Sequence, residues 1–430
     1  MSGEFDFTKI SDKCVKCGKC IQVCTIHNIN GDEVTSPRGF LDLLGAYKRG
    51  ELELDKDTKK IFESCFLCTN CVDSCNDSLP VDTMIENVRR DIAEKFGIAW
   101  YKRVAFWFLG HRKILDLAAK FGFVFKSCGF KTSDKFANSM SARFNFPLVK
   151  KERLLPSVAK KSFMNSHPEF INNGGAKTIG VFIGCMGNYA YTGIGEGILT
   201  IAKALKLNLH LMKKQACCGA PMYFTGDFKA VEKSAKFNIA YFEEILQSVE
   251  AIIVPEATCS AMIKVDYAHF FQNDPEWCER AKKVSEKIFM ATEYFDKFTN
   301  LKALLAGKRK TAQVITYHDA CHARKMQGVF KEPRNLLSIN YDIKEMKDSN
   351  QCCGFGGVTM QTDHYELSRK AGQSKIEMLK DMPLNVVSAE CSACKMQLNN
   401  ALHIAGLDKE CINPIELIAR VLYNDISDKN

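Results

Sequence analysis

Twenty cysteines stand in this 430-residue chain, and two repeated spacings among them constrain its fold more than any other feature. Near the N-terminus the spacing C-x2-C-x2-C-x3-C occurs twice, 51 residues apart. Further along, a cysteine, an adjacent Cys-Cys-Gly and one or two later cysteines form a unit that also occurs twice. Spacings repeated in this way indicate duplicated structural units, so two duplications are predicted, one after the other.

The N-terminal runs predict two four-iron clusters. This spacing places three thiolates in a loop around one face of a [4Fe–4S] cubane, while the fourth cysteine reaches the other cluster. Zinc is the alternative, but its sites usually use two separated C-x2-C pairs. Thr25 and Asn76 stand where such ferredoxins usually carry proline after the fourth cysteine. The first cluster is assigned to Cys14, Cys17, Cys20 and Cys75, and the second to Cys65, Cys68, Cys71 and Cys24.

Helices are predicted around and after these runs. Residues 41–53 fit a helix and its exit, and residues 81–95 fit an amphipathic helix with Asp82 near its start. Residues 100–125 are aromatic and basic, but their charges interrupt any run long enough to span a membrane. This stretch predicts a helical pair packed on the core or, alternatively, a surface that docks on a membrane or a membrane subunit. Cys128 has no partner in sequence and is interpreted as a structural thiol.

The duplicated second half predicts parallel strands. Short apolar, β-branched runs precede its cysteines and alternate with long helical patterns, as in α/β units. Ligands of such sheets lie beyond the carboxyl ends of the strands, so the thiols should converge at one end of each unit. Gly219 and Gly354 allow the backbone to fold closely around a cluster. The four runs are residues 178–183, 251–254, 314–317 and 386–387.

The two copies offer different thiols. Adjacent cysteines suit a disulfide poorly but can both face one metal cluster. Met262 stands in the first copy where the second has its fifth cysteine, and a thioether is a poor iron ligand there. The copies should therefore hold different clusters, or the first is degenerate, with zinc or purely structural thiols as alternatives. The first copy has Cys185, Cys217, Cys218 and Cys259, and the second has Cys321, Cys352, Cys353, Cys391 and Cys394.

Three further residues crowd around Cys321, namely His318, Asp319 and His322. Asp319 and His318 are predicted to cap the helix that follows and to tune the cluster by hydrogen bonds, and proton handling is the alternative. Cys278 and Cys411 belong to no motif and are interpreted as structural.

Composition indicates the cellular compartment and the kinds of partner to expect. The first residues include acids and lysines without an apolar signal region, so a reducing cytoplasm is expected and the cysteines point to metal. The formal net charge of +9 favours an anionic surface or partner, but no nucleic-acid motif accompanies it. The glycines of residues 193–197 do not form the dinucleotide motif, so no flavin or nucleotide site is predicted in this chain.

These patterns predict an α+β multidomain chain. An α-helical ferredoxin domain of the bacterial 2[4Fe–4S] type comes first, and two duplicated α/β cysteine-rich domains with short parallel sheets follow. The predicted boundaries are residues 1–95 for the ferredoxin domain, 96–176 for a helical connector, 177–305 for the first cysteine-rich domain (copy one) and 306–430 for the second (copy two).

In this order of domains the chain resembles the iron–sulfur subunits of glycolate oxidase and of anaerobic glycerol-3-phosphate dehydrogenase. It also resembles the catalytic chain of membrane-linked heterodisulfide reductases. The resemblance covers nearly the whole chain and is closest to the glycolate oxidase subunit. The motifs that carry it are CGKCIQVCTIHNINGDEVTSPRG, CFLCTNCVDSC, ATCSAMIKVDY, HDACHARKMQG and CCGFGGVTMQ.

The resemblance implies an electron-transfer subunit. A separate FAD-binding subunit would oxidise glycolate, lactate, another 2-hydroxy acid or glycerol-3-phosphate. This chain would pass the electrons to quinone, or to a quinone-reactive membrane subunit, at the inner face of the cytoplasmic membrane.

The heterodisulfide reductase likeness implies a non-cubane [4Fe–4S] cluster on the five cysteines of copy two. It gives a second functional hypothesis, the direct reduction of a disulfide or related substrate at that cluster. A cluster-based redox sensor or scaffold is the third.

Overall fold

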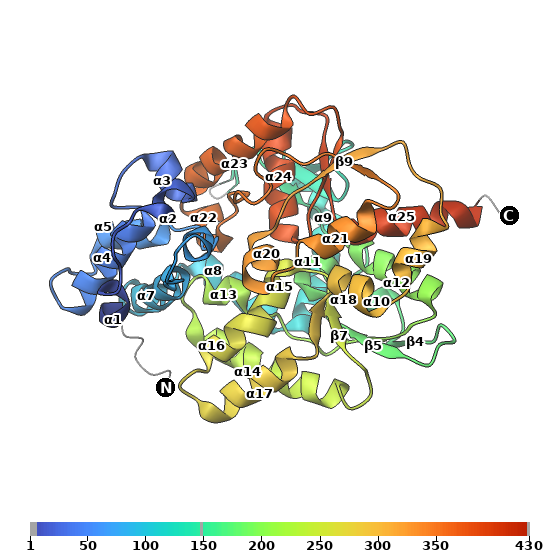
Figure 1. Ribbon diagram of the computed structural model, residues 1–430, viewed down its shortest axis with the longest axis horizontal. Coiled ribbons are helices and arrows are strands. Elements are labelled where there is room, and N and C mark those ends of the chain that lie inside the picture. Colours follow the sequence, from blue (N-terminus) through green and yellow to red (C-terminus); the bar gives the residue numbers. More distant parts are fainter. Residues whose placement is uncertain (1–6, 147–148, 428–430) are drawn as a thin grey trace.

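The computed structural model describes residues 7–146 and 149–427 (Figure 1). The N-terminal part, called the ferredoxin region below, is helical and lies at the left of Figure 1. Its cysteine loops are held between short helices that pack on the two longest, α4 and α7. Its helices are α1 (Phe7–Ser11), α2 (Lys19–Gln22), α3 (Thr25–Asn30), α4 (Pro37–Lys48), α5 (Lys56–Glu63), α6 (Asn70–Asp73) and α7 (Val81–Phe96).

Both helices predicted in this region are present. Helix α4 begins four residues earlier than expected because Ser36 caps it, accepting a hydrogen bond from Gly39 N, with Pro37 at the first helical position. It ends at Lys48, and the following residues 49–53 form the predicted exit. Helix α7 agrees with its prediction to within one residue.

The segment after α7 contains the predicted helical pair, but no residue of α9 is buried, so this helix does not pack into the core as expected. The segment also contains strands that the sequence did not indicate. Helices α8 and α9 are followed by a three-stranded antiparallel sheet, ordered β1-β2-β3. Within the described residues, no helix is long and apolar enough to cross a membrane. The elements are α8 (Trp100–Gly110), α9 (Arg112–Gly129), β1 (Phe130–Thr132), β2 (Ser139–Ala142), β3 (Leu154–Pro156) and α10 (Phe163–Ser166).

Copy one is built on a five-stranded sheet of order β4-β6-β5-β7-β8. Its strands are parallel except for the edge strand β4, which pairs antiparallel with β6. The strands are β4 (Phe170–Ile171), β5 (Thr178–Val181), β6 (Asn208–Leu211), β7 (Ile252–Val254) and β8 (Ile288–Met290). The helices are α11 (Gly184–Tyr189), α12 (Gly193–Leu205), α13 (Ala220–Tyr223), α14 (Phe228–Ile245), α15 (Ala257–Ala261), a π-helix (Met262–Asp266), α16 (Tyr267–Phe270), α17 (Pro275–Ser285), α18 (Ala291–Phe298) and α19 (Leu301–Ala306).

Copy two is built on a four-stranded sheet of order β10-β9-β11-β12, and all of its pairings are parallel. The strands are β9 (Val314–Tyr317), β10 (Asp342–Ile343), β11 (Val386–Ser388) and β12 (Glu410–Ile412). The helices are α20 (Cys321–Gln327), α21 (Lys331–Leu337), α22 (Gly357–Thr362), α23 (Tyr365–Leu379), α24 (Ser392–Ile404) and α25 (Pro414–Ser427).

The predicted fold class is therefore confirmed. All four predicted runs form strands, namely β5, β7, β9 and β11, and each is paired in parallel with a neighbour. Strand β5 ends at Val181, two residues earlier than its apolar run, because the chain then turns into α11 through Gly184 at φ +70°. The partner strands β6, β8, β10 and β12 were not predicted, because each has at most one β-branched residue, whereas each predicted strand has two or more.

The two copies share a core through α12 and α25. A Cβ on Gly197 would lie 2.9 Å from Ile415 Cγ2, and a Cβ on Gly195 would lie 2.5 Å from the Phe163 ring. Glycine thus allows close helix packing at these positions, which accounts for the glycine-rich stretch that lacked a nucleotide motif. The last helix of copy two is in this way fixed against the first long helix of copy one.

Candidate metal centres

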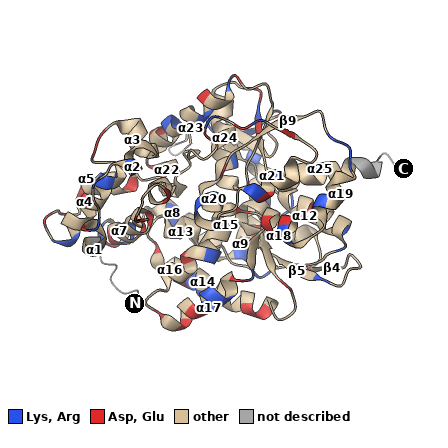
Figure 2. Cartoon of the chain, in the orientation of Figure 1, with Lys and Arg blue, Asp and Glu red and all other residues tan. Residues whose placement is uncertain are grey.

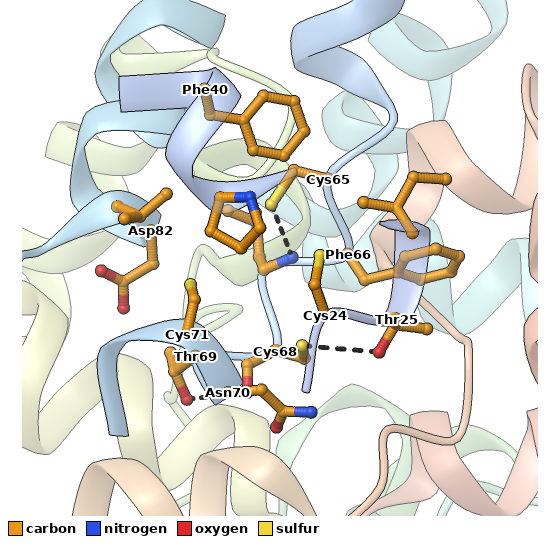
Figure 3. A pocket seen from close by; sticks show the side chains of 14 residues that line it. Cys24, Thr25, Phe40, Cys65, Phe66, Cys68, Thr69, Asn70, Cys71 and Asp82 are labelled. Atoms are coloured by element: carbon orange, nitrogen blue, oxygen red, sulfur yellow. Dashed lines mark hydrogen bonds between the residues drawn. The ribbon is translucent and has the colours of Figure 1, made fainter. Parts of the chain in front are cut away.

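The eight cysteines of the ferredoxin region gather into the two predicted groups. Cys20 lies near Cys14, Cys17 and Cys75, and burial followed by these neighbouring thiols raises its pKa to about 11. Figure 3 shows the sulfur atoms of the other group surrounding one space, lined also by Phe40 and Phe66. Its members are Cys24, Cys65, Cys68 and Cys71. The fourth cysteine of each run thus lies with the other run's three, as assigned from the spacing.

The two loops share a backbone conformation that suits a cluster. Lys16 and Gly18 have φ of 55° and 81°, and the equivalent Leu67 and Thr69 have φ of 51° and 56°. Non-glycine residues rarely adopt this left-handed region, which here turns successive N–H groups inwards. One of them, Leu67 N, donates to Cys65 Sγ at 3.4 Å. Such donors favour sulfur that carries negative charge, as thiolate ligands do.

The two positions that depart from the ferredoxin pattern carry polar contacts. Thr25 Oγ1 lies 3.8 Å from Cys68 Sγ, and Asn76 Oδ1 accepts from Lys19 Nζ at 3.0 Å. The first contact reaches a predicted ligand directly, and the second links the two cysteine runs. Neither substitution displaces the fourth cysteine of its run.

In copy one the four thiols form a continuous buried cluster. Cys185 follows β5, Cys217 and Cys218 follow β6, and Cys259 follows β7, so the carboxyl ends of three parallel strands bring them together. Side-chain contacts run from Cys185 through Cys217 and Cys218 to Cys259. Four thiols in mutual contact can hold an iron–sulfur cluster or a tetrahedral zinc ion.

Met262 lies at the edge of this cluster. Its side chain is fully buried, and its Cε is 3.7 Å from the position that a Cβ on Gly219 would take. It therefore occupies the structural place of the missing fifth thiol, next to the Cys-Cys-Gly turn, and offers only a thioether.

In copy two, four of the five thiols form a similar chain of contacts. Cys353 Sγ and Cys394 Sγ lie 3.2 Å apart, and Gly354 N donates to Cys352 Sγ at 3.3 Å. Hydrogen bonds from Cys352 and Cys394 lower the pKa of Cys353 to about 6, and one from Cys394 lowers that of Cys391 to about 5. The fifth thiol, Cys321, begins α20 after β9 and lies near Cys352 and Cys353.

The turn of copy two requires glycine. Gly354 has φ +88°, and a Cβ there would lie 2.6 Å from Ala371 Cβ and 3.0 Å from Gly372 N. The Cys352–Cys353 pair is thus pressed against α23, which fixes the direction of both thiols.

The three polar residues near Cys321 take different places. His318 is buried with a ring nitrogen within 4.8 Å of both Cys353 Sγ and Cys394 Sγ, and neither ring nitrogen has a hydrogen-bond partner among the described residues. Burial lowers its pKa well below the usual value, so the ring is neutral. His322 Nδ1 lies 3.6 Å from Cys321 Sγ. Both histidines can therefore reach a cluster in copy two.

Asp319 instead serves an ion-pair network. Its carboxylate accepts from Arg324 and from Arg334, and also from Ser349 Oγ at 2.9 Å. These partners tie the start of α20 to α21 and to the loop before Cys352. Asp319 thus holds the loops in position, but the predicted capping of α20 is wrong, because Ala320 is the N-cap residue and no side chain caps this helix.

Two buried charged residues that the sequence did not reveal lie near the thiols, one in each copy. Lys375 in α23 is fully buried, and its ammonium donates to Asp348 O at 2.6 Å and Ser349 O at 3.3 Å, facing Cys352, Cys353 and Cys394. In copy one, Glu256 lies near Cys185 and Cys259 and accepts from Ser392 N at 2.8 Å. Both occur in ordinary amphipathic or loop sequence, so no local pattern distinguishes them from solvated charges.

The thiols of both copies open into one cavity of about 350 Å³. Its walls are largely apolar, with Phe66 and Leu67 from the ferredoxin region and Phe106 and Leu109 from α8. The polar side chains in the lining include Glu256, Thr258 and His322. Eight cysteines reach it, namely Cys185, Cys218, Cys259, Cys321, Cys352, Cys353, Cys391 and Cys394.

The ferredoxin region is docked firmly on both copies. Cys68 Sγ is in hydrogen-bonding contact with Cys352 Sγ of copy two. The buried Arg89 donates to the carbonyls of Cys65, at 2.7 Å, and of Phe224 in copy one, at 3.0 Å. A Cβ on Gly226 would lie only 2.1 Å from Arg89 O, so glycine is required where α7 meets copy one.

The three remaining cysteines lie outside these groups. Cys128 is exposed on α9, Cys278 donates to Ala268 O at 3.5 Å, and Cys411 is buried in β12. Each has a position that a structural thiol can occupy.

Comparison with known families identifies the same parts. Residues 10–79 match the 4Fe-4S dicluster domain, and residues 179–264 and 315–399 each match the cysteine-rich domain called CCG. The chain thus carries one dicluster domain and two CCG domains, as the cysteine spacings predicted.

Two curated relatives are iron–sulfur or lactate-utilisation proteins. The probable glycolate oxidase iron–sulfur subunit of Bacillus subtilis (strain 168) is 27% identical over 92% of this chain and 89% of its own length. Lactate utilization protein A of Bacillus cereus (strain G9842) is 26% identical over 55% of this chain and 97% of its own length. The resemblance to the glycolate oxidase iron–sulfur subunit is therefore confirmed, and it supports a role in electron transfer.

A solved structure supports the fold alone. The crystal structure of a hypothetical protein from Helicobacter pylori aligns with a TM-score of 0.53, covering 97% of this chain and 74% of that one at 11% identity.

Proposed function

We propose that this chain is the iron–sulfur electron-transfer subunit of an FAD-linked dehydrogenase. The partner flavoprotein would oxidise glycolate, lactate, another 2-hydroxy acid or glycerol-3-phosphate, and quinone at the inner face of the cytoplasmic membrane would receive the electrons. Similarity to the probable glycolate oxidase iron–sulfur subunit over 92% of the chain supports this proposal.

The thiol groups fit the cofactors that this role needs. In the ferredoxin region, each predicted set of four cysteines suits one [4Fe–4S] cubane. The five cysteines of copy two suit a further cluster, and the four of copy one suit an iron–sulfur cluster or zinc. Bound clusters of this kind supply one-electron chemistry, while the surrounding side chains set its potential and exclude water.

The contact between Cys68 and Cys352 carries the proposal. Each is a predicted ligand of a different centre, one in the ferredoxin region and one in copy two, and the two thiols lie close enough to interact. Arg89 and Gly226 hold the ferredoxin region in this place. A protein that only stored metal would have no need for two centres so close together.

Reconstitution with the flavin subunit tests the proposal. The purified chain alone should not oxidise 2-hydroxy acids or glycerol-3-phosphate, because it has no flavin motif. Adding the FAD-binding subunit and substrate should reduce its clusters, measured by paramagnetic resonance. Substrate oxidation by the pure chain, or clusters that stay oxidised in the complex, would contradict it.

The shared cavity favours a second function, reduction of a disulfide or related substrate. Thiols of both copies line a space of about 350 Å³, large enough for more than water. Titrating the reduced protein with small disulfides should then oxidise the copy-two cluster and produce the free thiols. Absence of any spectral change across a series of disulfides would count against this function.

A further inference from the structure

We infer that the α8–α9 hairpin is a membrane-docking element that lies in the headgroup layer of an anionic lipid surface. The hairpin comprises residues 100–129 and occupies the segment between the ferredoxin region and copy one. The lipid contact is inferred from the surface of the hairpin itself, whereas the identity of the electron acceptor rests on the proposed function.

The outward face of α9 is apolar. None of the residues of this 18-residue helix is buried, although it lies within a well-packed protein. Its large exposed side chains lie three and four residues apart and so share one face, with Phe121 at 57% and Val124 at 68% exposure. That face is formed by Ile114, Leu117, Phe121, Val124 and Phe125. An amphipathic helix in water normally turns such a face towards the core.

The opposite side of the hairpin is fixed to the protein. Asp116 accepts from Tyr189 OH at 2.6 Å, and Arg112 donates to Gln215 O at 3.4 Å, both in copy one. In α8, Lys102 pairs with Asp363 of copy two at 2.7 Å. These contacts therefore hold the apolar face outwards, so its exposure does not result from loose packing of the helix.

The apolar surface continues beyond α9. Trp100 is 75% exposed at the start of α8, and Val104 and Trp107 follow at helical spacing. At the other end, exposed Phe146 stacks on Phe130. Tryptophan and phenylalanine at the border of an apolar face are typical of helices that lie in a lipid interface.

The charges around this surface select its partner. Acidic and basic residues alternate over most elements, for example α14, α17 and α18 (Figure 2). The hairpin has a single acid, Asp116, which the hydrogen bond from Tyr189 turns towards copy one. Arg112 and Lys126 donate to Gln215 O and Ser157 Oγ. The exposed basic residues of the hairpin are Arg103, Lys113 and Lys120. An apolar face bordered by cations complements anionic lipids, which attract each nearby cation.

Docking in this way would bring the thiol cavity close to the lipid. The inner side of α8 supplies Ala105, Phe106 and Leu109 to the wall of the 350 Å³ cavity. A single helix therefore separates the lipid-facing side chains from the space that both sets of thiols reach. A lipid-soluble electron acceptor would approach the clusters from this side.

Vesicle flotation of the intact, iron-loaded chain tests the inference. We expect flotation with vesicles of phosphatidylcholine and phosphatidylglycerol, weaker flotation with phosphatidylcholine alone, and partial loss at high salt. The double variant F121S/V124S should lower binding to both vesicle types. Loss of the Phe121 ring alone should account for about tenfold of this decrease. The double variant K113E/K120E should lower binding only to the anionic vesicles.

Matched controls separate the hairpin from general surface effects. Phe170 in β4 is exposed to 51% and borders Glu169, so F170S should leave flotation unchanged. K282E/K370E reverses the same number of exposed charges on α17 and α23 and should also leave it unchanged. Iron content equal to that of the original chain shows that each variant has folded.

Two outcomes would overturn the inference. One is flotation of the hairpin variants equal to that of the original chain, or no flotation of the original chain with anionic vesicles. The other is loss of the co-purified FAD-binding subunit in F121S/V124S while flotation persists, which would make the hairpin a protein-docking surface. Reduction of the clusters by the flavoprotein with a soluble dye as acceptor tests the proposed function separately, since it requires no lipid.

Discussion

The two CCG copies share a topology but differ in the ionisable groups around their thiols. In copy two, the ammonium of Lys375 faces the thiols from within the core, and His318 and His322 lie beside them. In copy one the buried acid Glu256 lies near Cys185 and Cys259, and burial followed by Cys391 of copy two raises its pKa to about 8. A cation favours the more negative, reduced state of a cluster, whereas an acid does not.

The difference indicates a division of labour. Copy two has five thiols, a fixed cation and direct contact with the ferredoxin region through Cys352. Copy one has four thiols, a thioether at the fifth place and a neutral or negative neighbour. Copy two is thus suited to accept electrons, and copy one to bind a metal that changes its charge less easily.

Removing one thiol from each copy should give the largest effect. C353S should remove about four iron atoms per chain and abolish electron transfer from the flavoprotein to a dye, because Cys353 contacts both Cys352 and Cys394. C218S should release the metal of copy one and leave the copy-two signal in place. Iron, zinc and sulfide analysis together with paramagnetic resonance measures both. Equal loss of the copy-two signal in the two variants would contradict the division.

Restoring the fifth thiol should change the metal of copy one. M262C places a thiol beside Gly219, where the buried thioether now lies, and should produce a new cluster signal or raise the iron content. M262L should leave the metal content as it was. Cysteine is smaller than the buried methionine, so M262C should lower the free energy of unfolding by about 1–3 kcal/mol, measured by denaturation. An unchanged metal content in M262C would show that the fifth position does not decide the cluster type.

Removing the buried cation should shift a potential. K375M should lower the midpoint potential of the copy-two cluster by roughly 60 mV, equivalent to about 1.4 kcal/mol for one electron. K370M, on the solvent side of the same helix, is the control and should shift it by far less, since exposed charges are screened. Potentiometric titration followed by paramagnetic resonance measures the shift. A rise in potential, or equal shifts in both variants, would argue against Lys375 acting through its charge.

The pH dependence of the same cluster gives the smallest effect. Burial lowers the pKa of Lys375 to about 8, so the ammonium is charged below that pH and neutral above it. The copy-two potential should therefore fall as pH rises through about 8, and by no more than the K375M shift. In K375M this step should be missing. A potential that is equally pH-dependent in both proteins would assign the step to another group.

Cysteine spacing predicted which thiols lie together because it depends on local geometry. Cys24 and Cys75 were each assigned to the other run's group, because a cysteine at the start of the following helix can reach that group. In the structure Cys75 lies near Cys20 and Cys24 lies near Cys68. Strands β5, β7, β9 and β11 were visible as apolar runs before thiols. Their partners β10 and β12 were not, because each has a single β-branched residue and is specified by the neighbouring strand.

Burial of charge could not be predicted from the sequence. Lys375 lies in a helix whose pattern is ordinary, and it becomes buried only because α23 packs against the loop that ends at Cys352. The burial of Arg89 could not be predicted either, because its hydrogen-bond partners include Phe224 O, which is distant in the chain. The sequence of α9 indicates a helix with aromatic residues, but it does not predict that they are exposed, because a helical period does not tell which side the rest of the protein will cover.

The docking of Phe66 and Leu67 over the shared cavity limits the routes by which metal can reach it. These side chains form one wall of the space that eight cysteines reach, and Arg89 fixes the loop that carries them. Metal that approaches the CCG thiols from this side must therefore arrive before the ferredoxin region settles on them.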